Sequence, residues 1–408
     1  EIFKLPNILR RFLISILTIL RSIHELVWCL ILMQIYGVNI SVGIIAICIP
    51  YIAINSKVFC EQIENINFKK YQSIKSISSN RFSNLITLIW IPINEILQNF
   101  GLYRLECSLR SSIILGLFGV GGIGTNIILN FKAFNFNELW TSILMLALLV
   151  IISKALFYNL KFKHLEPNKS IFLLIIFSTL LLYNCFFIFN FLINSNFNLS
   201  YFVETFSFSN INISISELVD NSFTTILISL SATAISISLP PILFLIFANK
   251  FIINILRFFA FFLRLIPPTI VVLILLMFNQ PSISLAALTL GIYNAAITFR
   301  LLNVNLNKID KDLYEGIISS GTSRRVSWIY GLFSKQARSY LSYCTYRSDI
   351  IIRETAIVGI IGGTGLGWKL TESISSFAWE DVGLILIAYS SIAIVGEILN
   401  GKIKLNLY

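Results

Sequence analysis

Long apolar runs separated by short polar stretches dominate this chain. Because a transmembrane α-helix needs about 20 mostly apolar residues, the pattern predicts an all-α polytopic membrane protein with about ten transmembrane helices. A basic stretch over residues 1–20 and another marked by Lys250, Arg257 and Arg264 are expected to form interfacial helices. The predicted spans are 23–36, 40–59, 99–118, 139–157, 171–193, 223–247, 265–278, 282–302, 343–361 and 382–399.

Lysine and arginine gather in only some of the polar stretches, and this predicts the orientation. They are frequent in 57–81, 154–169 and 303–336, whereas 194–221 contains neither. Cytoplasmic loops carry the excess of Lys and Arg, so the first three stretches are expected inside and the last outside. In 223–247, Pro240 and Pro241 predict a kink. Such a kink is tolerated because neighbouring helices can donate hydrogen bonds to the backbone carbonyls that the prolines leave without a partner.

Composition supports a membrane protein and argues against a nucleic-acid partner. Of 408 residues, 56% are hydrophobic and 12% charged, and the mean hydropathy is +0.81, whereas a soluble domain is about 25% charged. The net charge of +11 comes from basic residues between apolar runs, not from one basic face. We therefore expect a multi-pass membrane protein that contacts lipid and binds no nucleic acid.

A repeat is visible when the chain is shifted by 243 residues. We expect two repeats, 1–165 and 166–408, with the same topology, related by an axis along the membrane normal with a path between them. Spans 171–193 and 223–247 have no counterpart before Glu1, so we expect the first repeat to be truncated. The matching residues are Tyr103, Arg104, Arg110, Ile114, Gly116, Gly119, Gly122 and Gly124 with Tyr346, Arg347, Arg353, Ile357, Gly359, Gly362, Gly365 and Gly367.

The polar stretch 303–336 contains the motif E-G-I-x-x-x-G, with Glu315, Gly316 and Gly321. In the upstream copy, Gln72 replaces Glu315 and Ser78 replaces Gly321. The motif resembles the E-A-A-x-x-x-G loop of permease subunits in binding-protein-dependent ABC importers. It departs from that loop because glycine and isoleucine replace the two alanines and serine replaces the final proline.

Two further segments resemble the phosphonate and phosphite branch of these permeases. One is SYCTYRSDIIIRETAIVGIIGGTGLG, and the other is Arg21, Ile23, Glu25 and Trp28, which match R-x-I-P-E-x-x-W with His24 in place of proline. The resemblance covers nearly the whole chain twice. It implies that the polar loops dock on ATP-binding cassette subunits and that a periplasmic binding protein delivers the substrate, phosphonate or phosphite, or another small solute such as an amino acid.

No Walker A motif is present in the sequence. We therefore expect no cofactor on this chain and no enzymatic activity, with ATP bound and hydrolysed by a partner subunit. Two other classes stay open at this point. An ion-coupled secondary transporter would not need a docking loop, and a degenerate, non-transporting membrane subunit would fit the altered residues Gln72 and Ser78.

Charged residues recur inside one predicted span of each repeat. An acid and an arginine are spaced i, i+4, the favoured order for a helical pair. Charges within membranes seldom face lipid, so these residues either pair structurally near the inner interface or line a route for an anion. They are Arg347, Asp349 and Arg353, and in the first copy Arg104, Glu106 and Arg110.

Glycine-rich segments follow both charged spans. Gly119, Gly121 and Gly124 match G-x-G-x-x-G, but no β-α-β context surrounds them, and the match is weak alone. We expect close helix packing or a re-entrant turn near the outer face, because glycine lets backbones approach. His24 and His164 stand alone, so no metal site is expected there. The six cysteines are expected to pack as small core residues. The glycines concerned are Gly119, Gly122, Gly124, Gly362, Gly365 and Gly367.

Overall fold

The structure is a computed structural model, which describes residues 7–64, 91–159, 167–194, 200, 203, 207, 211–247, 250–306, 312–362 and 364–407. This part of the chain is helical throughout and contains no strand. It divides into two compact units, one with Glu1–Arg21 and Glu25–Leu199 and the other with Ser22–His24 and Ser200–Tyr408. The units divide after residue 199, whereas the predicted repeats divide after 165; the repeat boundary stays a prediction.

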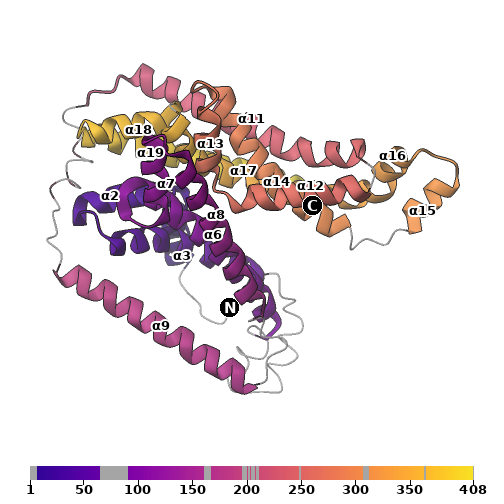
Figure 1. Cartoon of the computed structure of the whole chain (residues 1–408), viewed down its shortest axis with the longest axis horizontal. Helices are drawn as coiled ribbons and strands as arrows, with labels where there is room; N and C mark the ends of the chain where they lie inside the picture. The colour runs from indigo at the N-terminus through magenta and orange to yellow at the C-terminus, as the bar shows by residue number, and fades with distance from the viewer. Residues whose placement is uncertain are drawn as a thin grey trace. The chain divides into compact units, whose positions relative to one another are not determined.

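The first unit starts with a helix that is bent by 90° from the apolar helix after it. Two short breaks at Gly121–Gly122 and 133–135 then separate its later helices. Its elements are α1 (Asn7–Ser22), α2 (Glu25–Tyr36), α3 (Ile40–Glu64), α6 (Ile91–Leu115), the π-helix η2 (Gly116–Val120), α7 (Ile123–Lys132), α8 (Phe136–Asn159) and α9 (Pro167–Asn194) (Figure 1).

The second unit has a similar order, preceded by the long helix α11. A bend of 95° separates Phe251–Arg264 from Pro268–Leu276. The elements are α11 (Ile215–Ile246), α12 (Lys250–Leu265), α13 (Pro268–Leu276), α14 (Ile283–Leu306), α15 (Asp312–Ser319), α16 (Arg324–Ser327), the π-helix η4 (Trp328–Phe333), α17 (Ser334–Gly362), α18 (Gly365–Ser375) and α19 (Trp379–Leu407).

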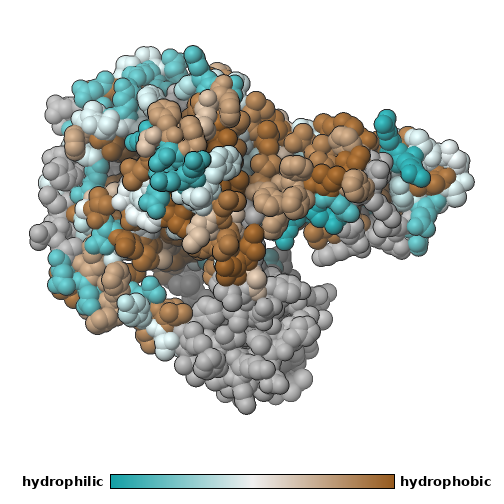
Figure 2. Space-filling model, viewed as in Figure 1, coloured by the Kyte–Doolittle hydropathy of each residue, from teal (hydrophilic) through white to brown (hydrophobic). Residues whose placement is uncertain are grey.

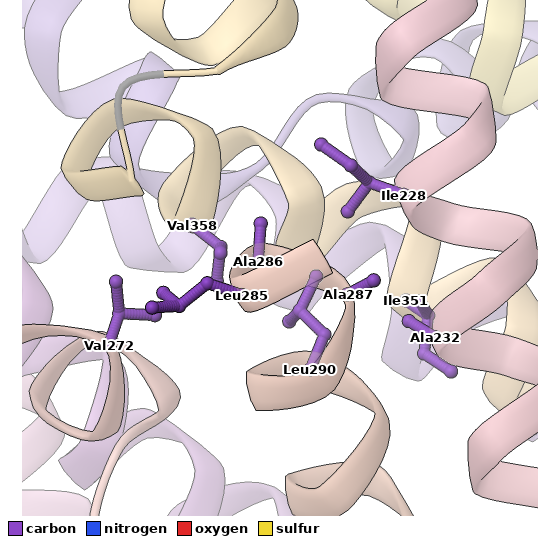
Figure 3. Close-up of a cluster of buried hydrophobic side chains, with 9 residues drawn as sticks. All are labelled: Ile228, Ala232, Val272, Leu285, Ala286, Ala287, Leu290, Ile351 and Val358. Atoms are coloured by element: carbon purple, nitrogen blue, oxygen red, sulfur yellow. The ribbon is translucent and has the colours of Figure 1, made fainter. Parts of the chain in front are cut away.

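The core of the second unit forms where α11, α13, α14 and α17 meet. Small residues on α14 let the helices approach, and Ala286 is fully buried. Figure 3 shows the cluster, in which side chains of α11, α13 and α17 lie around those of α14. It consists of Ile228, Ala232, Val272, Leu285, Ala286, Ala287, Leu290, Ile351 and Val358.

Five helices of the described part are long and apolar enough to cross a membrane, or up to seven if each bent pair counts as one span. The expected number of about ten is not confirmed. Many large apolar side chains are exposed on these helices, and such a surface fits lipid rather than water. Figure 2 shows hydrophobic surface over much of the visible face, and hydrophilic surface where α15 and α16 lie. The chain is an integral, polytopic membrane protein.

Helix positions recur at the 243-residue offset. α1, α3 and α8 start at Asn7, Ile40 and Phe136, and α12, α14 and α19 start 243 residues later. The corners before α8 and α19 also match, since Phe134 and Phe377 both have positive φ, 56° and 57°. Five backbone hydrogen bonds recur with them, for example Asn135 N to Asn130 O at 2.9 Å and Ala378 N to Ser373 O at 2.9 Å. Tandem fusion of two permease repeats stays a prediction, which this agreement supports.

Candidate functional site

The segment 312–333, named here the docking segment, contains the E-G-I-x-x-x-G motif. Glu315 and Gly316 lie on α15, none of whose residues is buried. Gly321 has φ of +87°, a left-handed conformation that favours glycine, and ends this helix. Ser323 then caps α16, its Oγ accepting from Val326 N at 3.4 Å. Gly321 therefore lets the chain turn between α15 and α16.

The docking segment is held together by close packing between α15 and η4. A Cβ on Gly331 would lie 2.8 Å from Tyr314 Cα, so only glycine lets η4 approach α15 this closely. Thr322 Oγ1 donates to Ile317 O at 2.6 Å, and a further hydrogen bond of 2.7 Å joins it to Ser327 Oγ. These contacts fix α15 against η4, while no residue of α15 is buried.

Glu315 at the surface of this segment is available to an outside partner. Its side chain is exposed, and within the described part of the chain no ion pair or hydrogen bond involves its carboxylate. A Cβ on Gly316 would meet nothing within 4 Å, so nothing inside this chain requires glycine there. Gln72 and Ser78, the upstream counterparts of Glu315 and Gly321, lie outside the described residues.

A buried polar cluster, here the second polar cluster, joins α14 to α17 and consists of Asn294, Arg347 and Glu354. Arg347 is 3% exposed and its Nη2 donates to Asn294 Oδ1. Asn294 Nδ2 donates to Glu354 Oε2 at 2.8 Å, and Arg347 Nη2 lies 3.9 Å from Glu354 Oε1. The amide therefore bridges the guanidinium and the carboxylate, and burial of the charge is offset.

The predicted pair between Asp349 and Arg353 is also present on α17, next to the second polar cluster. Arg353 Nη2 donates to Asp349 Oδ2 at the expected i, i+4 spacing. Both side chains are nearly buried, 12% and 11% exposed. The four charges 347, 349, 353 and 354 thus consist of two arginines and two acids on a single helix.

The first unit has an equivalent group, here the first polar cluster, made of Glu25, Tyr51, Arg104 and Ser111. The guanidinium of Arg104 lies 4.2 Å from the centroid of the Tyr51 ring, a cation–π contact. Tyr51 Oη is 3.1 Å from Ser111 Oγ, and Ser111 Oγ donates to Glu25 Oε1. The cluster joins α2, α3 and α6.

The other charged residues of the first unit are only partly described. Arg110 Nη2 lies 3.4 Å from Cys107 Sγ. The side chain of Glu106 lies outside the description, so its pairing with Arg110 stays a prediction.

Sequence reasoning missed the polar partners of the two arginines. Asn294 and Glu354 in the second unit, and Tyr51 and Ser111 in the first, were not predicted as site residues. The offset contained the signal, because Tyr51 aligns with Asn294 and Ser111 with Glu354. Polar residues at matched positions inside apolar runs therefore identify the clusters.

The glycine-rich segments form turns and close helix contacts. Gly119 and Gly122 have φ of +97° and +91°, and Gly365 has +66°. Gly124 packs directly on the carbonyl of Ile113. Gly362 ends α17, and Gly367 lies in the first turn of α18, where a Cβ on Gly359 would be 3.1 Å from its Cα. Within the described residues no three His, Cys, Asp or Glu side chains could hold a metal ion.

Known permeases resemble the chain over different lengths. The "Phosphate-import permease protein PhnE" of Mycolicibacterium smegmatis is 23% identical over 96% of this chain and 77% of that protein. A "Putative phosphite transport system permease protein HtxE" of Stutzerimonas stutzeri is 27% identical over 33% of this chain and 52% of its own length. A "Putative cryptic phosphonate transport system permease protein PhnE2" of Escherichia coli is 26% identical over 24% and 82%.

No protein-family model matches the chain. A solved structure of an amino acid ABC transporter with histidines covers 48% of this chain and all of that chain, with 15% identity and a TM-score of 0.37. The sequence relatives, one of them along nearly the whole chain, are all named as permeases, which agrees with the motif resemblance. The chain is therefore similar to the permease subunits of ABC transport systems, and it is an integral protein of the inner membrane.

Proposed function

We propose that this chain forms the membrane path of an ATP-driven importer for phosphonate or phosphite. A periplasmic binding protein delivers the solute, and separate ATP-binding cassette subunits hydrolyse ATP. The observation that carries the proposal is the similarity to an import permease over 96% of the chain. The exposed docking segment adds a surface suited to such a partner.

The docking segment supports the ATPase contact on chemical grounds. Its acidic residue Glu315 is exposed and has no partner within the described chain, so it can pair with a basic residue on another subunit. Arg324 and Arg325 are also exposed, and Tyr330 is 65% exposed. A surface that combines charges with an aromatic side chain suits a protein interface.

The cargo is proposed from the relatives' names. Those names mention phosphate, phosphite and phosphonate, and all three solutes are phosphorus oxyanions. Inorganic phosphate therefore belongs among the tested solutes. Another small solute such as an amino acid is the second candidate, because recognition in such systems lies largely in the binding protein.

The arginines of α17 leave two roles open. Each lies beside an acid within a buried region, which supports structural pairing. The alternative, that Arg347 and Arg353 line the anion route, predicts that Arg353→Ala abolishes uptake while the complex still assembles. Normal uptake by an assembled Arg353→Ala complex would rule out a route through that arginine.

The deciding experiment measures ATP-dependent uptake of methylphosphonate, phosphite and phosphate into proteoliposomes containing the full-length protein with its candidate ATPase and binding protein. Glu315→Ala is the test variant, and Gln72→Ala is its matched control in the upstream copy. We expect Glu315→Ala to abolish uptake of the transported solute and Gln72→Ala to reduce it little.

The other outcomes separate the candidate functions. Uptake of none of the three compounds, with ATPase activity still stimulated by the chain, would keep the importer and reject the cargo. Uptake that persists in Glu315→Ala and follows a proton or sodium gradient would favour a secondary transporter. If no solute moves and no ATPase binds, the chain is a non-transporting membrane subunit.

A further inference from the structure

Two adjacent prolines interrupt the backbone hydrogen bonding of α11. Pro240 and Pro241 lie inside this helix, and proline has no backbone N–H to donate to the carbonyl four residues earlier. The carbonyls of Ser236 and Ile237 therefore lose their usual helical donors. In an apolar environment each unsatisfied carbonyl is costly, so other groups must supply the missing hydrogen bonds.

Side chains from two neighbouring helices replace both missing donors. Thr298 on α14 donates from Oγ1 to Ser236 O at 2.8 Å, and Tyr340 on α17 donates from its hydroxyl to Ile237 O at 2.8 Å. Thr298 is 0% exposed and Tyr340 1% exposed. The predicted compensation by neighbouring helices is confirmed, and α11 remains helical through both prolines.

Tyr340 also lies at the end of a row of aromatic rings that starts in the docking segment. Trp328 stacks on Phe333, with centroids 5.2 Å apart. The Phe333 ring meets the Tyr340 ring edge-on at 6.1 Å. Tyr314 of α15 packs against the buried hydrophobic cluster that contains Phe244 and Tyr340. A continuous packed path therefore connects α15, the exposed helix with Glu315, to the carbonyl of Ile237.

The docking segment contacts α11 on the other side of the prolines as well. Phe244, three residues after Pro241, is stacked on Trp328 at 6.0 Å and on Phe299 at 4.9 Å. Tyr340 thus holds α11 just before the prolines, and Trp328 holds it just after them. A displacement of the docking segment acts on both sides of the point where α11 has two fewer backbone hydrogen bonds.

We propose that Tyr340 and Thr298 are positioning residues that transmit movement of the docking segment to α11. The inference rests on the proposed function, in which a partner ATPase moves this segment. Closure of the ATPase shifts η4, the aromatic row shifts with it, and α11 bends at its prolines while Tyr340 and Thr298 keep the carbonyls of Ile237 and Ser236 paired. Such coupling requires packed, contiguous elements, which the described contacts supply.

The test measures solute transported per ATP hydrolysed in the reconstituted complex of the full-length protein. Tyr340→Phe removes only the hydroxyl, and Thr298→Val removes the other donor. Tyr346→Phe and Thr289→Val are matched controls. The Tyr346 hydroxyl makes no hydrogen bond to the described residues, and Thr289 Oγ1, equally buried, donates only to carbonyls of its own helix, Leu285 O and Ala286 O.

We expect solute transported per ATP to fall about fivefold in each test variant, the size of one net hydrogen bond, while ATPase activity and both controls stay close to wild type. Thr298→Ser, which keeps the hydroxyl, should restore coupling. An unchanged ratio in Tyr340→Phe, or an equal fall in Tyr346→Phe, would overturn the proposal. A wild-type complex that transports nothing would instead reject the proposed function.

A double variant separates coupling from a purely structural role. Pro241→Ala restores the N–H that Ile237 O lacks, so the helix no longer needs the Tyr340 hydroxyl for stability. If Tyr340 only stabilises α11, Tyr340→Phe has no effect on either melting temperature or coupling in the Pro241→Ala protein. Under our proposal the melting temperature is restored but the coupling ratio still falls. The same comparison with Thr298→Val and Pro240→Ala provides an independent reading.

Discussion

Arg104 in the first unit and Arg347 in the second lie 243 residues apart, on helices that lead into equivalent glycine-rich turns. Both are buried, and both contact a polar residue of the preceding long apolar helix, Tyr51 or Asn294. Their clusters differ in the source of the carboxylate. In the second unit it comes from Glu354 on the same helix as the arginine, and in the first from Glu25 on α2.

The difference between the clusters is reciprocal. Ser111 aligns with Glu354, and Pro268 aligns with Glu25, so each unit has an acid at one of two positions and not at the other. A buried charge must be paired, but the pairing depends on distance and not on which helix supplies the acid. The comparison teaches that the requirement kept in both units is one carboxylate near the buried arginine.

The largest effect is expected from removing that carboxylate. Glu354→Gln in the second unit removes the carboxylate paired with the buried Arg347, and breaking such a pair costs about 3 kcal/mol of unfolding free energy. Glu25→Gln in the first unit removes the carboxylate that Ser111 joins to the cluster of Arg104, and a loss in the same direction is expected. Thermal unfolding of the purified protein in detergent measures the loss. A negligible change in either variant would show that the arginine there is neutralised by another group.

Relocating the acid within the first unit tests the comparison directly. In a Glu25→Gln protein, Ser111→Glu places the acid where the second unit has it and should recover most of the lost stability. Ser112→Glu is the matched control, because Ser112 is exposed and adjacent. Equal recovery by both substitutions would mean that general charge, and not position in the cluster, is what matters.

A smaller, matched effect is expected at the first glycine of each turn. A Cβ on Gly116 would lie 2.9 Å from Gly121 O, and one on Gly359 would lie 2.7 Å from Thr364 O. Because backbone atoms must shift, Gly116→Ala and Gly359→Ala should each cost about 1–3 kcal/mol. Gly101, with nothing within 4 Å of its Cβ, serves as control, and Gly101→Ala should stabilise by about 0.5–1 kcal/mol.

The glycine comparison has a clear failing result. If Gly116→Ala lowers the melting temperature and Gly359→Ala does not, then the two turns do not share their packing. In that case the agreement of helix boundaries would reflect similar length alone.

The smallest effect concerns an ion pair that only the second unit has. Lys369 on α18 lies 2.6 Å from Glu217 and 2.9 Å from Glu372, whereas Asn126 occupies the equivalent position in the first unit. The hydrogen bonds that Lys369 donates, to Glu217 first and to Glu372 second, raise the pKa of Lys369. The partners are partly exposed, so Lys369→Met should cost only about 0.5 kcal/mol, less at high salt.

The pH dependence of this pair follows from the direction of the shift. A raised pKa in the folded state means that the stabilisation is fully present below the ordinary lysine pKa of 10.5 and disappears as the pH rises through the folded value. The difference in melting temperature between wild type and Lys369→Met should therefore be constant from pH 7 to 9. A difference that already shrinks in that interval would contradict the assignment.

Several features of the fold and site could be predicted before the structure. The Asp349–Arg353 pair follows from i, i+4 spacing, which is a property of one helix. The turn at Gly321 could be expected because glycine readily adopts positive φ, which other residues rarely do. The number of spans was harder to predict, because α6 and α17 carry several charges among their apolar residues.

The sequence by itself determined the features that depend on neighbours along the chain: membrane character, the 243-residue repeat, the exposed acidic motif and the need for outside donors at Pro240 and Pro241. Only the tertiary structure decided which groups meet the buried needs. Thr298 and Tyr340 reach the freed carbonyls, and Asn294 joins Arg347 to Glu354, because α14 and α17 pack on α11 and on each other. Hydrogen bonds act over a few ångströms, so residues 53 to 103 positions apart become partners only after the helices have packed.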